Sequence, residues 1–297
     1  MIQRMEQIQA CPICGNAAYN PFLECKDHSV SRETFTIVQC NDCGFRFTNP
    51  RPEEDRIGEY YKSEDYVSHS NTSKGLINTA YQFVRKYTLR RKLALISSLV
   101  TKGRLLDIGC GTGEFLAVCK EAGWNVSGIE PSKEAREQAI QNHQLEVHNE
   151  DKLSEYANES FDMITMWHVL EHVPKLQERI RDIKRLLKKG GILVVAVPNC
   201  ASGDALHYKE YWAAYDVPRH LYHFRPNDIQ KVFEEKEMKV VDMLPMKFDS
   251  FYVSMLSEKY LHGKQRIFHA LWRGLLSNLS ASRKGTTYSS QIYIIKK

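Results

Sequence analysis

The chain lacks a long hydrophobic run, an internal repeat and a low-complexity tract. Its longest apolar stretch, 192–197, is far shorter than the roughly 20 residues of a transmembrane helix, and its first residues lack the apolar segment of a secretory signal. A net charge of +5 over 297 residues is too small to indicate a polyanionic partner by itself. We therefore expect a cytoplasmic globular protein without a transmembrane segment.

Cysteine is concentrated in two short motifs. Of the eight cysteines, Cys11 with Cys14 and Cys40 with Cys43 form Cys-x-x-Cys-Gly knuckles. In a cytoplasmic chain, two knuckles of this kind indicate tetrahedral zinc rather than disulfides. Four thiolates leave no open coordination position, so we expect this zinc to be structural.

The stretch 105–115 (LLDIGCGTGEF) predicts a buried strand that leads through a glycine-rich turn into a helix. Gly109, Gly111 and Gly113 let the backbone turn sharply and approach a ligand at a helix N-terminus, which indicates a nucleotide-like cofactor. The Gly-x-Gly-x-Gly spacing disfavours a dinucleotide. Asp107 would also face a pyrophosphate unfavourably, whereas it would suit a cofactor with a positively charged end.

Three further motifs follow the glycine loop in order, at 128–132 (GIEPS), 160–164 (SFDMI) and 169–174 (VLEHVP). Together the four motifs resemble those of class I S-adenosylmethionine-dependent methyltransferases, here with an N-terminal zinc-ribbon module. The resemblance implies an α/β fold with a doubly wound, mostly parallel seven-stranded sheet of the Rossmann-like kind. It also implies S-adenosylmethionine as the cofactor and methyl transfer as the activity.

The same resemblance implies how the cofactor would be held. Asp107 would bind the methionine amino group, Glu130 would bind the ribose hydroxyls, and the glycine loop would pass beneath the carboxylate and the ribose. Adenine is expected near the end of the third strand, and the methionine side is lined by the end of the fourth. The residues assigned to the cofactor are Asp107, Gly109, Cys110, Gly111, Gly113, Glu130, Glu150, Asp151, Met166 and Trp167.

Strands and helices alternate from residue 104 onward, which indicates a parallel sheet covered by helices on both faces. Strands are expected at 104–108, 125–129, 144–148, 161–166, 191–197, 240–244 and 290–295, and helices at 53–61, 74–100, 114–122, 133–142 and 175–188. We divide the chain into a zinc ribbon (1–48), a helical linker or cap (49–103) and a methyltransferase domain (104–297), with an insertion at 247–289 that suits a lid or an interface. The basic cluster at 85–92 is interpreted as a solvated helix face.

Aromatic, basic and histidine side chains crowd the segment 205–224. Because loops at the carboxyl ends of strands often carry function, we expect this segment to line the acceptor pocket. The residues assigned to the acceptor are Trp212, Tyr215, Arg219, Tyr222 and His223. A hydroxyl acceptor also needs a base, for which His172 and His220 are the candidates.

Two interpretations apply to His168, Glu171 and His172, which lie at helical spacing. In small-RNA 2′-O-methyltransferases, a Glu-x-x-Glu-His arrangement with a distant histidine binds a divalent cation, and ubiquinone-biosynthesis O-methyltransferases resemble this chain at 170–174. Here His168 stands in place of the first glutamate. We therefore expect Glu171 and His172 to cap and pack the turn after the fourth strand, rather than to bind a metal.

The favoured function is methylation of a small molecule or glycoconjugate at a sugar, lipid or ring hydroxyl, since methyltransferases with such zinc modules resemble sugar-modifying enzymes. The alternative is an RNA methyltransferase whose zinc module grips RNA. The low net charge and the motif at 166–169, which differs from that of adenine amino-methyltransferases, argue against RNA. A cofactor-binding scaffold without activity is disfavoured by the intact glycine loop. No pattern fixes the acceptor atom or the oligomeric state.

Overall fold

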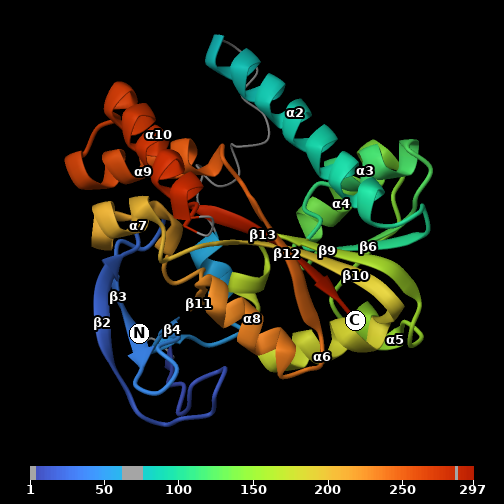
Figure 1. Ribbon diagram of the computed structural model, residues 1–297, viewed down its shortest axis with the longest axis horizontal. Helices are drawn as coiled ribbons and strands as arrows, with labels where there is room; N and C mark the ends of the chain where they lie inside the picture. Colours follow the sequence, from blue (N-terminus) through green and yellow to red (C-terminus); the bar gives the residue numbers. More distant parts are fainter. Residues whose placement is uncertain (1–4, 62–75, 285–286) are drawn as a thin grey trace.

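Seven strands form the main sheet of the computed structural model, which describes residues 5–61, 76–284 and 287–297 (Figure 1). The strands are β6 (Arg104–Ile108), β7 (Asn125–Ile129), β8 (Val147–His148), β9 (Phe161–Trp167), β10 (Leu187–Pro198), β12 (Lys239–Pro245) and β13 (Ser290–Lys296). Their order is β12-β13-β10-β9-β6-β7-β8. Among these seven strands, β13 alone runs in the direction opposite to the other six. The sheet confirms the predicted fold class. Because the order reverses at β6, the ligand crevice is expected where β6 and its neighbours end.

Helices cover both faces of this sheet. They are α2 (Leu76–Leu99), α3 (Glu114–Glu121), α4 (Lys133–His143), α5 (Lys152–Glu155), α6 (Leu176–Leu186) and α8 (Pro226–Glu234). Side chains alternate between the two faces along a strand. On β10, Val195 packs in one core with α6 and α8, whereas Val194 packs in the other with α2 and α3. This is the three-layer packing of a doubly wound sheet.

The N-terminal residues contribute to a second, four-stranded sheet in the order β11-β4-β3-β2. Its strands are β2 (Tyr19–Lys26), β3 (Thr34–Cys40), β4 (Arg46–Thr48) and β11 (Tyr222–His223), and a separate pair joins β1 (Met5–Glu6) to β5 (Arg51–Pro52). Since β11 follows β10 in the chain, the N-terminal module shares a strand ladder with the rest of the protein. Phe45 and Phe47 also belong to the same buried cluster as the α6 face of the main sheet. The division at residue 48 stays a prediction.

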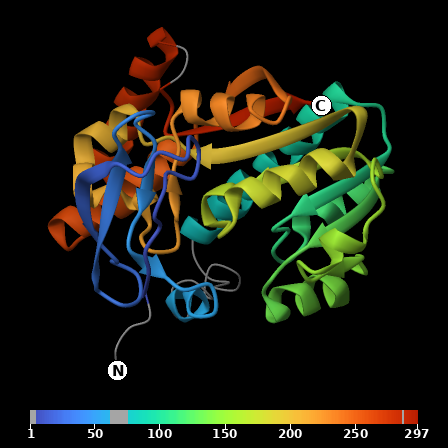
Figure 2. The ribbon, with the colours of Figure 1, turned by 90° about the horizontal axis from the view of Figure 1, so that it is seen from below.

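The insertion between β12 and β13 folds as α9 (Asp249–His262) and α10 (Ile267–Lys284). α10 packs on α7 (Gly203–Tyr208), and α9 packs on the short turns η3 (Lys209–Tyr211) and η4 (Ala213–Tyr215). In both views these helices, orange to red, lie at the same end of the molecule as the blue N-terminal strands (Figures 1 and 2). One side of α10 is exposed, with Phe268 at 91% and Trp272 at 56%. In the described part of the chain, no helix is long and apolar enough to cross a bilayer.

Two predicted elements are shorter than expected. The predicted helix 53–61 contains a turn and a short 3₁₀ helix, η1 (Ile57–Tyr61). The predicted strand 144–148 shrinks to β8, because Gln144 adopts a left-handed conformation (φ 51°) where α4 ends. The first two residues of the predicted helix 74–100 lie outside the described residues.

Several observed helices form where the sequence pattern predicts none, among them α7 and α8. Both carry local start signals: Ser202 caps α7 by accepting from the N–H of Ala205, and α8 begins with Pro226, whose fixed φ favours the first helical position. Each of these helices is short, at 6 and 9 residues. Their apolar periodicity is therefore too brief to stand out in the sequence.

Candidate functional site

Gly109, Gly111 and Gly113 turn the chain from β6 into α3, and all three have positive φ (73°, 55° and 86°). The backbone N–H groups of Gly109 and Cys110 donate to the carbonyl of Ile129 at 2.7 and 3.1 Å. These bonds tie the loop to the end of β7. The loop is thereby held at the carboxyl edge of the sheet, in the conformation that glycine adopts without strain.

The three glycines do not serve the same purpose. A Cβ at Gly109 would lie 2.4 Å from Val169, and one at Gly113 would lie 2.6 Å from Leu145. A Cβ at Gly111, by contrast, would have no heavy atom within 4 Å outside its chain neighbours. Two glycines are therefore needed for packing, whereas the Cβ position of Gly111 faces open space.

The carboxylate of Glu130, at the end of β7, lies against the glycine loop. One oxygen accepts from the N–H of Gly111 and the other from the N–H of Ser132, both at 2.9 Å. Burial raises the pKa of this carboxyl, while the two N–H donors act in the opposite direction. Each oxygen keeps a lone pair beyond these bonds, so a fixed acceptor remains available for a pair of hydroxyl groups.

Asp107 is buried at the end of β6, with 2% of its surface exposed. The Thr165 hydroxyl donates to it at 2.6 Å. Burial raises the pKa of Asp107 to about 7, against the opposing effects of Thr165 and of the nearby Lys92 ammonium. That ammonium, from α2, lies 4.2 Å from the ring centre of Trp167. A carboxylate, a cation and an indole thus meet beside the glycine loop.

The basic cluster at 85–92 is only partly solvated, which corrects the interpretation of it as a solvated helix face. Lys86, Arg90 and Arg91 are exposed. Arg85, however, is ion-paired with Glu114 at the start of α3, and Lys92 turns toward Trp167. The reason is helical periodicity: position 92 falls on the face of α2 that packs against the sheet.

The remaining residues assigned to the cofactor occupy different environments. Met166 is fully buried in the α6-side core, whereas Trp167, the next residue on the strand, faces the opposite side and contacts Phe115 edge-on at 5.5 Å. Glu150 is ion-paired with Arg179 at 2.7 Å. Asp151 and Cys110 are exposed and half-buried, respectively. Their contacts with the cofactor stay predictions.

A cluster of histidines and one carboxylate lies near the end of β9. Glu171 and His172 belong to the short helix η2 (Leu170–His172), and His220 comes from the loop before β11. The rings of His172 and His220 meet edge-to-face, with centroids 4.5 Å apart. Each ring places Nδ1 on a backbone carbonyl, that of Arg219 at 3.0 Å for His172 and that of Ala214 at 2.9 Å for His220. The Tyr61 hydroxyl lies 2.9 Å from the same Nδ1 of His172.

Glu171 is 1% exposed, and neither of its oxygens has a hydrogen-bond partner. The nearest cation is His168, whose Nδ1 lies 3.5 Å from one carboxylate oxygen and whose Nε2 lies 3.1 Å from Asp249 of α9. Burial alone would lower the pKa of His168, but Asp249 and Glu171 raise it to about 10. Burial and the neighbouring His220 lower the pKa of His172 to about 4. His172 is therefore neutral at pH 7, and its role as a base stays a prediction.

The five residues assigned to the acceptor are all buried and engaged within the protein. Arg219 pairs with Asp27 at 3.1 Å and with Asp216 at 2.6 Å. The others follow the same pattern: Trp212 donates to Asp204, Tyr222 donates to Pro174, His223 contacts Thr48, and Tyr215 packs between Trp212 and His223. Several of these contacts join the N-terminal module to the rest of the chain. Their direct contact with an acceptor stays a prediction.

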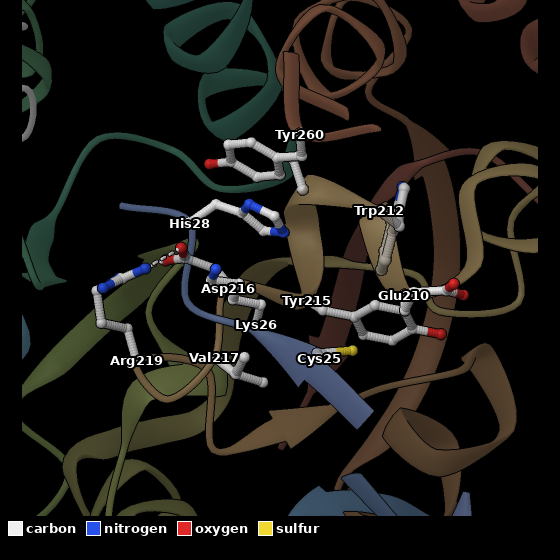
Figure 3. Close-up of a pocket in the computed structure, with 11 residues that line it drawn as sticks. Cys25, Lys26, His28, Glu210, Trp212, Tyr215, Asp216, Val217, Arg219 and Tyr260 are labelled. Carbon is white, nitrogen blue, oxygen red and sulfur yellow. Dashed lines mark hydrogen bonds and ion pairs between the residues drawn. The ribbon is translucent and has the colours of Figure 1, made fainter. Parts of the chain in front are cut away.

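A small pocket lies between β2, the 210–219 segment and α9 (Figure 3). Trp212, Tyr215 and Arg219 line it, and His28 stacks on Tyr260 at one side, with ring centroids 4.3 Å apart. Its lining includes no residue of the glycine loop and none of the three groups Glu171, His172 and His220 among the residues described. The pocket is therefore separate from both halves of the site described above.

The four knuckle cysteines come together as predicted. Their Sγ atoms all lie within 4.8 Å of one another, and the Cys11–Cys43 and Cys14–Cys40 sulfurs are 3.5 Å apart. Each knuckle closes through a bond from the glycine that follows it, at 3.0 Å in both cases. Zinc–sulfur bonds of about 2.3 Å in a tetrahedron place sulfurs ~3.8 Å apart, so the group fits zinc.

Sequence reasoning missed several residues of the site. Lys92 could have been found, because it lies three residues after Leu89 and four before Ile96, both of which pack in the core. Asp27 is followed by serines whose N–H groups it accepts, a recognisable turn signature. Thr165 and Asp249 carry no such signal, since tertiary packing alone brings them to Asp107 and His168.

Comparisons with known proteins agree with this geometry. Residues 81–242, more than half of the chain, match the model of a methyltransferase domain. A ubiquinone biosynthesis O-methyltransferase of Glaesserella parasuis is 36% identical over 107 residues, which cover 32% of this chain and 45% of that protein. The chain thus spans less than half of this relative's length.

Two further matches extend over more of the chain. A ubiquinone biosynthesis O-methyltransferase of Rickettsia typhi is 22% identical over 204 residues, 63% of this chain and 82% of that protein. The structure of a proposed sarcosine dimethylglycine methyltransferase from Galdieria sulphuraria superposes with a TM-score of 0.52 at 14% identity, covering 82% of this chain and 98% of that one. On the matched domain, the seven-stranded sheet and the glycine loop, the chain belongs to the class I S-adenosylmethionine-dependent methyltransferases.

Proposed function

We propose that the protein transfers a methyl group from S-adenosylmethionine to an oxygen atom of a small molecule or glycoconjugate. The observation that carries this proposal is the fixed carboxylate of Glu130 beside the open space at Gly111. A carboxylate at this place can accept hydrogen bonds from both ribose hydroxyls. The buried Asp107 gives the same site an anionic end, which suits the methionine amino group of this cofactor.

The residues around Asp107 fit the rest of the cofactor. The Lys92 ammonium suits a carboxylate, and Trp167 with Phe115 forms an aromatic wall on the α2 side. When bound, the cofactor supplies an electrophilic methyl group on a sulfonium. The protein's own part is to hold the reactants in line and to exclude water. Arg85 and Lys92 of α2, which contact Glu114 and Trp167, would help to exclude water on that side.

Three observations support a small oxygen acceptor. Glu171 and His220 are buried and His172 is half-buried, and the three groups form a polar cluster near the end of β9, which suits a small ligand better than a polymer. The relative from Glaesserella parasuis is named as an O-methyltransferase. Part of the basic cluster at 85–92 is engaged in internal contacts, which weakens the case for an RNA groove. We propose that the segment 205–224 shapes this side by positioning His220.

We further propose that the four knuckle cysteines hold one structural zinc. The Sγ distances and the two glycine turns support this proposal. With four thiolates, the ion has no open position for a substrate. Its effect on function is therefore to fix the strands that pair with β11.

Methyl transfer from isotopically labelled S-adenosylmethionine into fractionated cell extract tests the proposed function. We expect label in the small-molecule or saccharide fraction, resistant to ribonuclease. At a cofactor concentration that does not saturate the protein, the Glu130→Ala variant should transfer less label, because its cofactor affinity is lower. The matched control is Glu134→Ala, an exposed carboxylate four residues further on. Label found only in ribonuclease-sensitive material would overturn the small-molecule acceptor. Tighter binding of a nicotinamide dinucleotide than of S-adenosylmethionine would overturn the cofactor.

A further inference from the structure

We propose that α10 docks the protein on the surface of an anionic lipid bilayer. The helix has 18 residues, which span ~27 Å, and it lies at the rim of the molecule beside α9 (Figure 1). Large apolar side chains are exposed along one side, which we call the outer face: Phe268, Leu271, Trp272, Leu275, Leu276 and Leu279. A continuous exposed apolar surface of this kind marks an interaction site.

The polarity of α10 is the reverse of that of a helix that covers a core. Such a helix directs its large apolar side chains inward, whereas α10 directs small residues toward the protein. The buried residues of this inner face are Ala270, Gly274, Ser277 and Ala281. They follow one another at intervals of three and four residues, so they form one stripe, and the outer face lies on the opposite side of the helix.

Contacts of the inner face fix α10 in this orientation. A Cβ at Gly274 would lie 2.8 Å from the ring of Phe251, so glycine is needed for the close approach of α9 and α10. On the same face, Ser277 donates to the buried carboxylate of Asp204 at 2.8 Å. Turning α10 to bury its outer face would break both contacts. The exposed apolar stripe is therefore part of the packed fold.

Charge identifies the partner. Residues 259–284 include six basic residues and no acidic residue, whereas the whole chain has a net charge of only +5. Exposed side chains among the six are Lys259, Lys264, Arg266 and Arg283. Glu258, which precedes this segment, is buried and is paired with His269. The surface around the outer face is therefore positively charged, as is suited to anionic headgroups.

A bilayer fits both the apolar and the basic parts of this surface. An interfacial amphipathic helix lies in the membrane plane, with its apolar side reaching ~5–10 Å into the boundary between headgroups and acyl chains. Trp272 suits that boundary, because its ring is apolar and its N–H is polar. A second copy of the chain fits less well, since a symmetric contact would also bring together the basic groups of the two copies.

Flotation of the full-length protein with lipid vesicles tests the proposal. The probes are vesicles of phosphatidylcholine alone and of phosphatidylcholine mixed with phosphatidylglycerol. We expect binding to the anionic vesicles that falls with added salt, and binding to the neutral vesicles that is weaker by about tenfold or more. Phe268→Ser and Trp272→Ser should each weaken binding to the anionic vesicles by about tenfold. The matched control is Ile140→Ser, an exposed apolar residue of α4, which should bind as the unmutated protein does.

Two further measurements separate the contributions of charge and insertion. Lys264→Glu and Arg283→Glu should each weaken binding to anionic vesicles, whereas Lys189→Glu, at an exposed lysine of β10, should change it little. Trp272 is exposed and the other three tryptophans are buried or half-buried. Brominated lipid should therefore quench the emission of the unmutated protein but not that of Trp272→Phe. The melting temperature shows whether each variant still folds.

Absence of binding to anionic vesicles would overturn the proposal, as would binding that survives both serine substitutions in α10. Self-association that is lost with Phe268→Ser, in protein that does not bind vesicles, would assign the outer face to a second copy instead. Methyl transfer measured without vesicles tests the proposed function separately, because none of the substituted residues belongs to the glycine loop or the histidine cluster.

Discussion

The cofactor loop and the histidine cluster are built in opposite ways. Gly111 and Glu130, which close the cofactor side, are 19 residues apart in the sequence. The histidine side depends on contacts such as Arg219 with Asp27 and His220 with Thr48, which span 192 and 172 residues. The cofactor half is thus encoded in two motifs close together in the sequence, whereas the histidine half depends on contacts with the N-terminal module.

This difference bears on stability as well as on recognition. The cofactor half is destabilised at neutral pH by Asp107, because burial disfavours its charged form. The histidine side is held in place by buried ion pairs and by a strand ladder with the N-terminal sheet. Substitutions in the two halves should therefore have different signatures in unfolding and in binding.

Removing a zinc ligand should have the largest effect of these substitutions, and it should act on the histidine half. Structural zinc contributes ~10–16 kcal/mol to the folding of small zinc modules, so Cys40→Ser should unfold the N-terminal sheet and release β11. We expect loss of the zinc, a lower melting temperature and loss of methyl transfer. Elemental analysis and circular dichroism measure the first two effects. The control is Cys25→Ser, a buried cysteine outside the cluster, which should keep its zinc.

The next largest effect is expected for Arg219→Met. This change leaves Asp27 and Asp216 without their cation in a buried place, which typically costs ~3–5 kcal/mol of unfolding free energy. Urea denaturation measures the loss. The matched control is Arg56→Met, which breaks an exposed pair with Glu59 and should change stability little. Equal effects of the two substitutions would contradict the buried pairing.

The same pairing predicts how stability depends on pH. Burial opposes ionisation of Asp27 and Asp216, but the pKa of both carboxyls is lowered below its usual value, by Arg219 at both and also by the N–H groups of Ser29 and Ser31 at Asp27. A lowered pKa gives stability that is present above the pKa of the unfolded chain and is lost as the pH falls through the folded pKa. The difference between the unmutated protein and Arg219→Met should therefore shrink in acid, below about pH 4.

The sequence predicts the cofactor half well because its determinants are local. Gly109 and Glu130 lie in motifs whose spacing has a direct chemical reason, and the structure places both at the predicted edge. The histidine half was only partly predictable. His172 and His220 could be named, but the ladder between β4 and β11 could not. Neither could the lack of hydrogen bonds to Glu171, which depends on how Asp249 of α9 orients His168.

In the cofactor half, Asp107→Asn should change stability and cofactor binding in opposite directions. The pKa of Asp107 is raised to about 7 in the folded protein, so its stabilising effect is complete below the unfolded pKa and is lost as the pH rises toward 7. Asparagine does not titrate. Relative to the unmutated protein, the variant should therefore gain unfolding free energy between about pH 4 and pH 8, by up to about 4 kcal/mol. It should bind S-adenosylmethionine more weakly over the same range.

Chemical denaturation at several pH values, with calorimetry of cofactor binding, measures both quantities for Asp107→Asn. Thr165→Val is the matched control, because it removes the hydrogen bond to Asp107 and keeps the carboxylate. That control should lose stability instead of gaining it at about pH 8, since the ionised carboxylate then lacks its donor. If the stability difference between the Asp107→Asn variant and the unmutated protein is flat with pH, the pKa of Asp107 is not raised.

The smallest expected effect concerns Glu130, and it tests whether the cofactor half is as local as it looks. Glu130→Ala removes a charged acceptor that also holds Gly111 and Ser132, so cofactor affinity should fall by roughly 1–3 kcal/mol. Because no contact of Glu130 reaches the N-terminal module in the residues described, the zinc content should not change. Calorimetry and elemental analysis of the same preparation check both expectations. A loss of metal in Glu130→Ala would show that the two halves fold as one unit, since the substitution itself touches only the loop.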